Sequence, residues 1–246
     1  MPDRLEEIAR AKQEVRERVW TRLERERAAR FPGAKGRIPN FAGAENAARR
    51  LASLPEWADA RVVKANPDAP QLPVRAAALA AGKLLAMAVP RLADPRPFVL
   101  LDPATLATTG RRAVSIRGAL RDGRRVTIDE LPPVDLIVCG SVAVTADGVR
   151  VGKGGGFSDL EFGLLVEVGL VGDQTLIATT VHPLQVVDGP LPETEHDFRV
   201  DLLVMPERVI RCAGKRRPTG IIWDHLDAAK ISAVPVLAMR TARGPT

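Results

Sequence analysis

The first thirty residues alternate between apolar and charged positions with a helical period. Apolar side chains recur every three or four residues over 4–30, which predicts an amphipathic α-helix. Acids and bases alternate on its other face, as is typical of a solvated surface with i,i+4 ion pairs. Pro and Gly then interrupt the pattern in a connector over 31–41, and a second helix is expected over 44–54. The apolar positions of the first helix are Leu5, Ile8, Val15, Val19 and Leu23.

From residue 60 the pattern changes to short apolar runs. A strand over 61–65, an alanine-rich helix over 73–81 and a strand over 83–89 form a βαβ unit, which implies neighbouring parallel strands and a right-handed crossover. Continuously apolar strands indicate a sheet covered on both faces. We therefore expect an α/β fold, a three-layer sandwich with a largely parallel sheet flanked by helices and preceded by the N-terminal helix. Further strands are expected at 98–101, 136–139, 175–181 and 202–205.

The chain has 246 residues, of which 46% are hydrophobic, so it can bury a substantial core. We expect one domain over 1–246, with the helix at 4–30 and a tail at 213–246 that is basic at first and then apolar enough to dock on the domain. No apolar run approaches the roughly 18–20 residues that span a bilayer. With no signal-like N-terminus, a cytoplasmic protein without membrane partners is expected.

Charge and cysteine content narrow the function only slightly. The formal charge of +6 suits phosphorylated or polyanionic ligands but does not by itself indicate nucleic acid. Cys139 and Cys212 stand apart without CxxC spacing, so neither a disulfide framework nor a zinc site is predicted. An arginine-rich stretch over 105–125 is either a mobile lid over an anionic ligand or a solvated excursion between strands.

The most informative segment is Gly152-Lys153-Gly154-Gly155-Gly156, between an expected strand and an expected helix over 160–168. Glycine allows positive φ and close approach of backbone N–H groups to a ligand, and a helix N-terminus favours anions. The pattern suits phosphate, although it does not fit GxxxxGK[ST] and glycine-rich turns also serve only to connect strand and helix tightly.

Three charged residues are candidates to bind a phosphate or its metal ion beside such a loop. Asp159 starts the following helix and is either a Mg²⁺ ligand or a plain helix cap. Lys12 and Arg16 are four residues apart, hence on one side of the first helix, and either project together toward phosphates or are surface charges.

Together these motifs resemble a known family. Lys12 and Arg16 match the Lys-x-x-x-Arg of its first helix, and Gly152 to Asp159 match Gly-[Arg/Lys]-Gly-x-Gly-[Tyr/Phe]-x-Asp. The chain resembles the 5-formyltetrahydrofolate cyclo-ligases (methenyltetrahydrofolate synthetases) over about residues 10–240. Segments such as Ile38-Pro39-Asn40-Phe41 are most similar to the methenyltetrahydrofolate synthetase domain-containing branch.

The resemblance implies an enzyme that uses ATP and Mg²⁺ to close the formyl group of 5-formyltetrahydrofolate onto N10. The products would be 5,10-methenyltetrahydrofolate, ADP and phosphate, and catalysis would be mainly positioning and charge neutralisation. It implies that Asp159 assists the metal. It also implies phosphate contacts from Lys12, Arg16, Lys153 and the backbone of Gly154, Gly155 and Gly156.

The chain departs from the usual family loop, Gly-Arg-Gly-Lys-Gly-Tyr-Tyr-Asp. Gly155 stands where the second basic residue would be, and Phe157 and Ser158 replace the tyrosine pair. The glutamate usual after the first sheet strand is not evident, and Asp68 and Gln71 are the nearest polar candidates in its place. Phe157, Ser158, Asp68, His182 and Gln185 are therefore the candidates for contact with the substrate, expected to be a reduced folate.

Alternatives remain for individual residues and for the whole chain. His182, at a strand end, is either satisfied by nearby backbone or acts as a general base, and Glu195-His196-Asp197 either contacts substrate or caps a turn. The same fold could act on a different formyl, amide or carboxyl substrate, or serve as a non-catalytic nucleotide- or RNA-binding regulator. RNA binding is disfavoured because aromatic RNP-like strands are missing. The sequence allows a monomer or a dimer.

Overall fold

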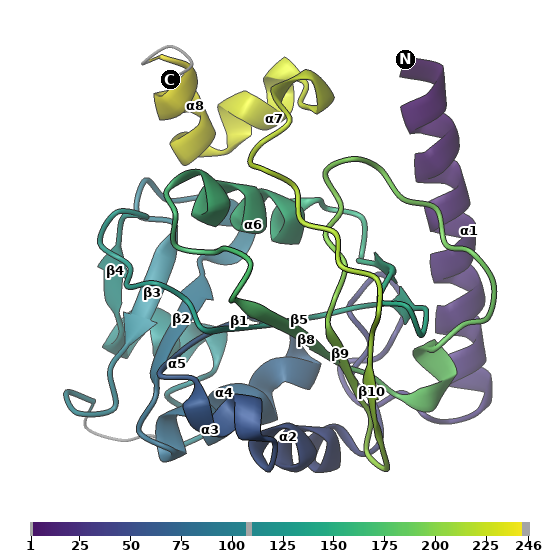
Figure 1. Ribbon diagram of the computed structural model, residues 1–246, viewed down its shortest axis with the longest axis horizontal. Helices are drawn as coiled ribbons and strands as arrows, with labels where there is room; N and C mark the ends of the chain where they lie inside the picture. Colours follow the sequence, from purple (N-terminus) through teal and green to yellow (C-terminus); the bar gives the residue numbers. More distant parts are fainter. Residues whose placement is uncertain (1, 107–109, 243–246) are drawn as a thin grey trace.

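The short apolar runs assemble into one mixed sheet at the centre of the computed structural model, which describes residues 2–106 and 110–242 (Figure 1). The strand order within these residues is β10-β9-β8-β5-β1-β2-β3-β4. The five strands from β9 to β2 are parallel, and β10, β3 and β4 join antiparallel at the two ends. The strands are β1 (Val62–Ala65), β2 (Leu84–Ala88), β3 (Phe98–Leu101), β4 (Arg124–Val126), β5 (Leu136–Cys139), β8 (Leu176–Thr180), β9 (Leu202–Val204) and β10 (Val209–Arg211).

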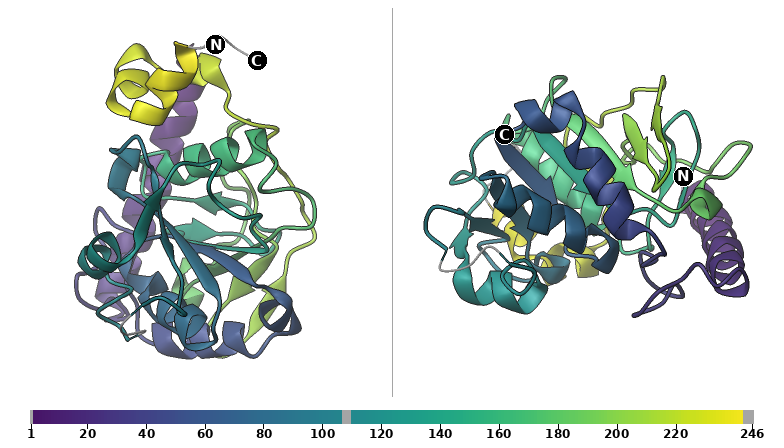
Figure 2. Two further views of the ribbon diagram at one scale, coloured as in Figure 1. Left: turned by 90° about the vertical axis from the view of Figure 1, so that its left-hand side faces the viewer. Right: turned by 90° about the horizontal axis from the view of Figure 1, so that it is seen from below.

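Helices cover both faces of this sheet, so the expected three-layer α/β architecture is confirmed (Figures 1 and 2). On one face α2 (Ala44–Ala52), α3 (Pro55–Asp59) and α4 (Leu72–Ala80) pack on the strands. On the other, α6 (Phe157–Glu167) and residues of the C-terminal helices α7 (Ala228–Ala233) and α8 (Pro235–Thr241) do the same. Burial on both faces explains why β1 and β5 are apolar throughout.

The N-terminal helix packs beside the sheet, against a small accessory ribbon. Helix α1 (Pro2–Arg25) buries Val19 and Leu23 against β6 (Ala143–Val144) and β7 (Arg150–Val151), which form a separate two-stranded sheet. Burying each such side chain contributes about 1.5–3 kcal/mol. The same contacts bring Arg16, about one turn before Val19 on α1, to the loop that leaves β7.

Several predicted boundaries were wrong. Helix α1 ends at Arg25 rather than residue 30, because Arg27 turns to φ 52° and the Ala28 N–H bonds the Leu23 carbonyl, which closes the helix. The helix expected over 44–54 ends at Ala52, and Pro55 starts α3.

The arginine-rich stretch holds α5 (Ile116–Asp122), capped by the Ser115 hydroxyl, and the edge strand β4. Two of its arginines pair locally, Arg121 with Asp122 and Arg124 with Glu130. Arg111 and Arg125 pair with the more distant Glu45 and Asp94. These features fit a solvated excursion between strands; residues 107–109 lie outside the described part of the chain.

The C-terminal tail and four 3₁₀ turns complete the described structure. The tail packs on the same core as α6, with Val234 and Leu237 buried, while residues 243–246 lie outside the described range. No helix among the described residues is long and apolar enough to cross a membrane. The 3₁₀ turns are η1 (Ala69–Gln71), η2 (Pro90–Leu92), η3 (Pro183–Gln185) and η4 (Trp223–His225).

Candidate functional site

The glycine segment forms a tight loop from β7 into α6. Gly154 has φ 104° and Gly156, the residue before the helix, has φ 67°, so two turns of the loop use backbone angles that L side chains rarely adopt. The first backbone N–H groups of α6 lack partners within the helix and point out of its N-terminus. The loop therefore presents N–H donors and the positive end of the helix dipole, as an anion site requires.

Two basic residues of α1 lie against this loop. Arg16 donates from Nε to the Gly152 carbonyl at 2.7 Å, and its guanidinium carbon lies 3.4 Å from where a Cβ on Gly154 would be. Lys12 bonds the Asp197 carboxylate at 2.5 Å. Both side chains are almost fully buried, and desolvation lowers the pKa of Arg16 although Asp197 opposes this. The sequence-predicted pair is thus brought to the glycine loop.

Asp159 lies in the first turn of α6 and is held by a buried arginine. Arg150, from β7, donates to Asp159 Oδ1 at 2.6 Å, and its guanidinium stacks 4.1 Å from the Phe198 ring. Burial raises the pKa of Asp159, against the lowering influence of Arg150. Arg150 therefore neutralises a carboxylate that would be costly to bury alone.

A second carboxylate, Asp197, sits beside the first. Burial alone would raise its pKa, but Lys12 together with the N–H and hydroxyl of Thr194 holds the pKa below its usual value. Asp197 and Asp159 repel each other, which contributes to the raised pKa of Asp159. Asp197 thus caps its own turn, which matches the capping interpretation of the Glu195-His196-Asp197 segment; contact of this segment with substrate stays a prediction.

A cavity of about 240 Å³ opens between the loop and the C-terminal tail. His196 and His225 are hydrogen-bonded to each other in its wall, with their Nδ1 atoms 3.0 Å apart, and burial lowers the pKa of His196. Lys230 reaches in from α7 and donates to the Gly155 carbonyl at 2.7 Å. Its walls are formed by Gly154, Gly155, Gly156, Asp159, Leu160, His196, Gly220, Ile221, Ile222, His225, Leu226, Asp227 and Lys230.

The other flank of the loop faces the end of β1. Lys153, with 44% of its side chain exposed, bonds Asp68 at 2.6 Å. Ser158 lies 3.4 Å from the Asn66 amide, and Phe157 lies under the Lys230 ammonium group, 3.5 Å from ring centre to nitrogen. Four of the predicted substrate or phosphate contacts thus lie in or beside one loop: Asp68, Lys153, Phe157 and Ser158.

The two remaining candidates have structural bonds of their own. His182 accepts the Leu184 N–H at Nδ1 and packs edge-on against Phe41, and burial lowers its pKa. Gln185 is fully buried and donates to the carbonyls of Ser141 and Val142, while its oxygen accepts the His182 N–H. These contacts match the backbone-satisfied interpretation of His182 and leave Gln185 no free amide group for a ligand.

Three residues of the site escaped the sequence interpretation. Arg150 precedes the motif within a two-residue strand, and His225 and Lys230 follow it by some seventy residues. Only the ordinary pairing rule, that a buried acid needs a partner, could have suggested a basic residue near Asp159.

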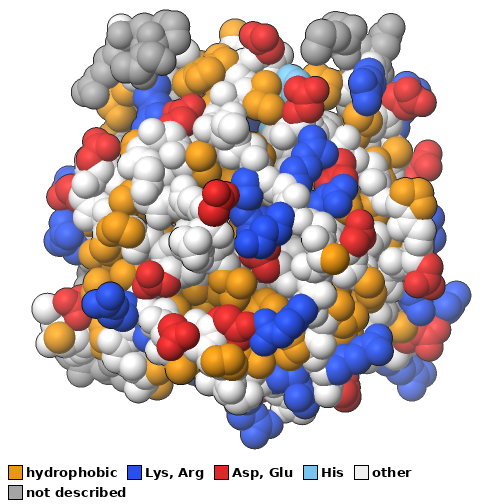
Figure 3. Space-filling view, in the orientation of Figure 1, with side chains coloured by type: hydrophobic (Ala, Val, Ile, Leu, Met, Phe, Trp, Pro, Cys, Tyr) orange, Lys and Arg blue, Asp and Glu red, His pale blue; other side chains and the backbone are white. Residues whose placement is uncertain are grey.

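The face seen in Figure 3 carries acidic and basic side chains interspersed, rather than one continuous basic surface.

No group of three His, Cys, Asp or Glu that could enclose a metal occurs among the residues described. Burial raises the pKa of both cysteine thiols, that of Cys212 to about 12, so neither is an activated nucleophile.

Comparisons with known proteins agree with this geometry. A sequence model described as the 5-formyltetrahydrofolate cyclo-ligase family matches residues 8–206. The mouse methenyltetrahydrofolate synthase domain-containing protein is 40% identical over 232 residues, covering 92% of this chain and 62% of its own length. The human protein of the same name is 37% identical over 240 residues, or 95% of this chain and 62% of its own length. The chain thus spans about three fifths of these relatives.

A solved structure shares the fold. The NMR structure of Aquifex aeolicus 5,10-methenyltetrahydrofolate synthetase superposes with a TM-score of 0.53 at 24% identity, covering 83% of this chain and 94% of that one. Family match, relatives and fold coincide with the resemblance carried by the Lys12, Arg16 and glycine-loop motifs. The chain belongs to the 5-formyltetrahydrofolate cyclo-ligase family, a family of ligase-type enzymes.

Proposed function

We propose that this chain is an ATP- and Mg²⁺-dependent cyclo-ligase that converts 5-formyltetrahydrofolate into 5,10-methenyltetrahydrofolate, with release of ADP and phosphate. The observation that carries the proposal is the glycine loop, whose positive-φ residues and helix N-terminus line a cavity with basic residues around it. We place this activity in the cytoplasm, as the sequence analysis predicts.

The chain's own residues would act by positioning and by charge. Backbone N–H groups of Gly154, Gly155 and Gly156 would cradle the phosphates of ATP, and Lys153 would exchange Asp68 for a phosphate oxygen. Arg16 fixes the start of the loop through the Gly152 carbonyl, and Lys12 supplies positive charge behind it. Such fixed donors need no reorganisation when charge develops on the transferred phosphoryl group.

Asp159 fits a Mg²⁺ ion held jointly with phosphates. Arg150 bonds one of its carboxylate oxygens, while the side chain remains 15% exposed on the cavity wall. Mg²⁺ is usually bound through one or two carboxylates plus substrate phosphates, so an enclosing set of protein ligands is not required. When bound, the ion would neutralise charge on the phosphates.

The reaction needs little covalent chemistry from the protein. The formyl oxygen would attack the γ-phosphorus and ADP would leave; N10 would then attack the activated formyl carbon, lose its proton, and phosphate would depart. Holding the formyl oxygen in line with the γ-phosphate is the main demand on the site.

The test is to mix purified protein with Mg-ATP and 5-formyltetrahydrofolate and to follow the methenyl chromophore and ADP together. Equal amounts of both products, abolished or strongly reduced by Lys153→Ala, are expected. ATP binding without either product would refute the folate substrate.

One observation favours a second candidate, the same phosphoryl-activation chemistry on another formyl, amide or carboxyl substrate. Phe157 and Ser158 replace the usual tyrosine pair, and the Phe157 ring is covered by Lys230 instead of facing a pterin. Substrate-stimulated ADP release across a panel of such compounds would identify it, and a panel without stimulation would exclude it.

A further inference from the structure

The tail beyond the family match reaches back over the glycine loop. Lys230 lies 24 residues past residue 206, where the match ends, yet its ammonium group is 2.7 Å from the Gly155 carbonyl. Asp227 accepts the Lys230 N–H at 2.6 Å and starts α7, which fixes where this side chain leaves the helix. The position of Lys230 over the loop is therefore set by the fold of the tail.

Two further contacts hold the tail in place. The Ile221 N–H bonds Glu167 at the end of α6, and His225 bonds His196. Trp223 and Leu226 pack against the same core as α6. The segment is thus tied to the domain on both sides of the cavity, and Lys230 projects from a supported element.

The loop lacks a cation at the place where Lys230 lies. Residue 155 is glycine and supplies no side chain to the loop, and a Cβ there would lie 2.9 Å from the Phe157 ring. Lys230 stands over that same ring and bonds the carbonyl of Gly155 itself. The space that a side chain at 155 would claim is filled by Phe157, and the positive charge comes from another part of the chain.

The present bonding of Lys230 is incomplete for a partly buried cation. Among the residues described, its ammonium group bonds one carbonyl and one aromatic face and has no carboxylate within ion-pair distance, although the Asp227 carboxylate acts on it from further away. An ammonium group has three donors, so it can bond an anion without losing these contacts. Burial lowers its pKa, so an anion in the cavity would be a favourable partner.

We propose that Lys230 is a phosphate-binding residue of the nucleotide site, supplied by the C-terminal tail in place of the basic residue missing at Gly155. This rests on the proposed nucleotide function and deepens it. The tail then completes the site, and the loop's own Lys153 and the distant Lys230 contact the polyphosphate from opposite flanks.

The experiment measures binding of Mg-ATP, Mg-tripolyphosphate and AMP to the full chain by calorimetry. Lys230→Met keeps the apolar stem over Phe157 but removes the charge, and Lys230→Arg restores it. Lys215→Met removes a charge from an exposed position on the same tail and is the matched control. Thermal unfolding of each variant reports whether the tail stays docked.

Lys230→Met is expected to weaken Mg-ATP and tripolyphosphate about tenfold to a hundredfold, as for loss of one charge-assisted hydrogen bond, with AMP changed less than about threefold. Lys230→Arg and Lys215→Met should bind like the parent. Unchanged binding by Lys230→Met, while Lys153→Ala loses it, would overturn the role of Lys230 and leave the proposed function standing. Equal losses for AMP and tripolyphosphate would also overturn it, because Lys230 would then act only through the tail's structure. A parent that binds neither Mg-ATP nor tripolyphosphate would refute both proposals.

Discussion

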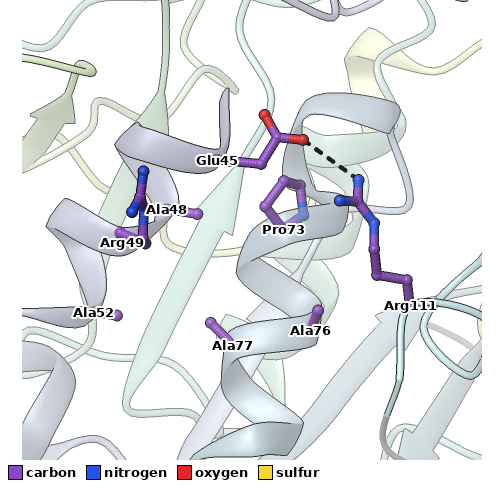
Figure 4. A pocket seen from close by; sticks show the side chains of 8 residues that line it. All are labelled: Glu45, Ala48, Arg49, Ala52, Pro73, Ala76, Ala77 and Arg111. Carbon is purple, nitrogen blue, oxygen red and sulfur yellow. Dashed lines mark hydrogen bonds and ion pairs between the residues drawn. The ribbon is translucent and has the colours of Figure 1, made fainter. Parts of the chain in front are cut away.

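The cavity at the glycine loop and a groove between two helices have similar volumes but are lined by different kinds of residue. The cavity at the glycine loop measures about 240 Å³, and a groove between α2 and α4 measures about 280 Å³. The groove is walled mainly by alanines and Pro73, with a single exposed ion pair, Arg111 to Glu45, at its rim (Figure 4). The cavity has a helix N-terminus, the partly buried carboxylate of Asp159 and a lysine from a distant segment.

The difference shows what distinguishes a site from a gap between helices. Small side chains on two packed helices form most of the groove wall. The glycine-loop cavity gathers groups whose pKa values are shifted by burial and by each other, which is where functional residues concentrate. Substitutions in the two places should therefore have very different consequences.

The largest effect is expected from Arg150→Ala. It leaves Asp159 buried without its partner, which should lower the free energy of unfolding by about 3–5 kcal/mol. Urea unfolding measures this. In the double variant with Asp159→Ala the loss should be smaller than the sum of the two single losses, because neither charge is then left alone. A loss below about 1 kcal/mol for Arg150→Ala would contradict the pairing.

Gly154→Ala should be next. Its φ of 104° is strained for alanine by about 1–3 kcal/mol, and relief would shift the loop against Arg16. We expect roughly tenfold weaker Mg-ATP binding. Gly172→Ala is the control, because Gly172 is exposed outside the glycine loop, has no positive φ, and a Cβ there meets no atom within 4 Å. Equal Mg-ATP affinity of the two variants would show that nucleotide binding does not depend on the backbone conformation of Gly154.

A smaller effect should appear on acidification. Burial lowers the pKa of His196 in the folded state, so below its ordinary value of 6.5 the unfolded chain binds more protons and stability falls as the pH falls. The groups facing this ring are His225, Asp197, Asp159 and Lys12.

Melting temperatures between pH 7.5 and 5.5 test this effect. The parent should lose stability over this range, and His196→Asn should lose less, since it removes the group whose protonation differs between the two states. An identical slope in both proteins would show that His196 does not contribute.

The smallest effect belongs to the groove. Arg111→Ala removes an exposed ion pair and should change stability by less than about 1 kcal/mol, with Mg-ATP affinity unaltered. Calorimetry and thermal unfolding check both. A clear loss of nucleotide affinity would give the α2–α4 groove a function after all.

Periodicity predicted most of the fold. The parallel strands at the sheet centre are short, fully apolar runs, and such runs have few alternatives once a βαβ unit is established. The ends of helices and the strands at the sheet edge were harder to predict from the sequence. Strand β4 has two exposed arginines and lacks an apolar pattern. Helix α1 ends where Arg27 adopts a positive φ, and arginine is not a residue type that predicts this backbone angle.

The sequence by itself determined the N-terminal helix, the central strands, the family and the glycine loop, because each depends on a local pattern or a short motif. Only the tertiary structure decided which charges meet. Lys12 pairs with Asp197 across 185 positions, and Lys230 reaches Gly155 across 75. Such pairings depend on how whole elements pack, and the energy of a buried charge depends on neighbours that are remote in the chain.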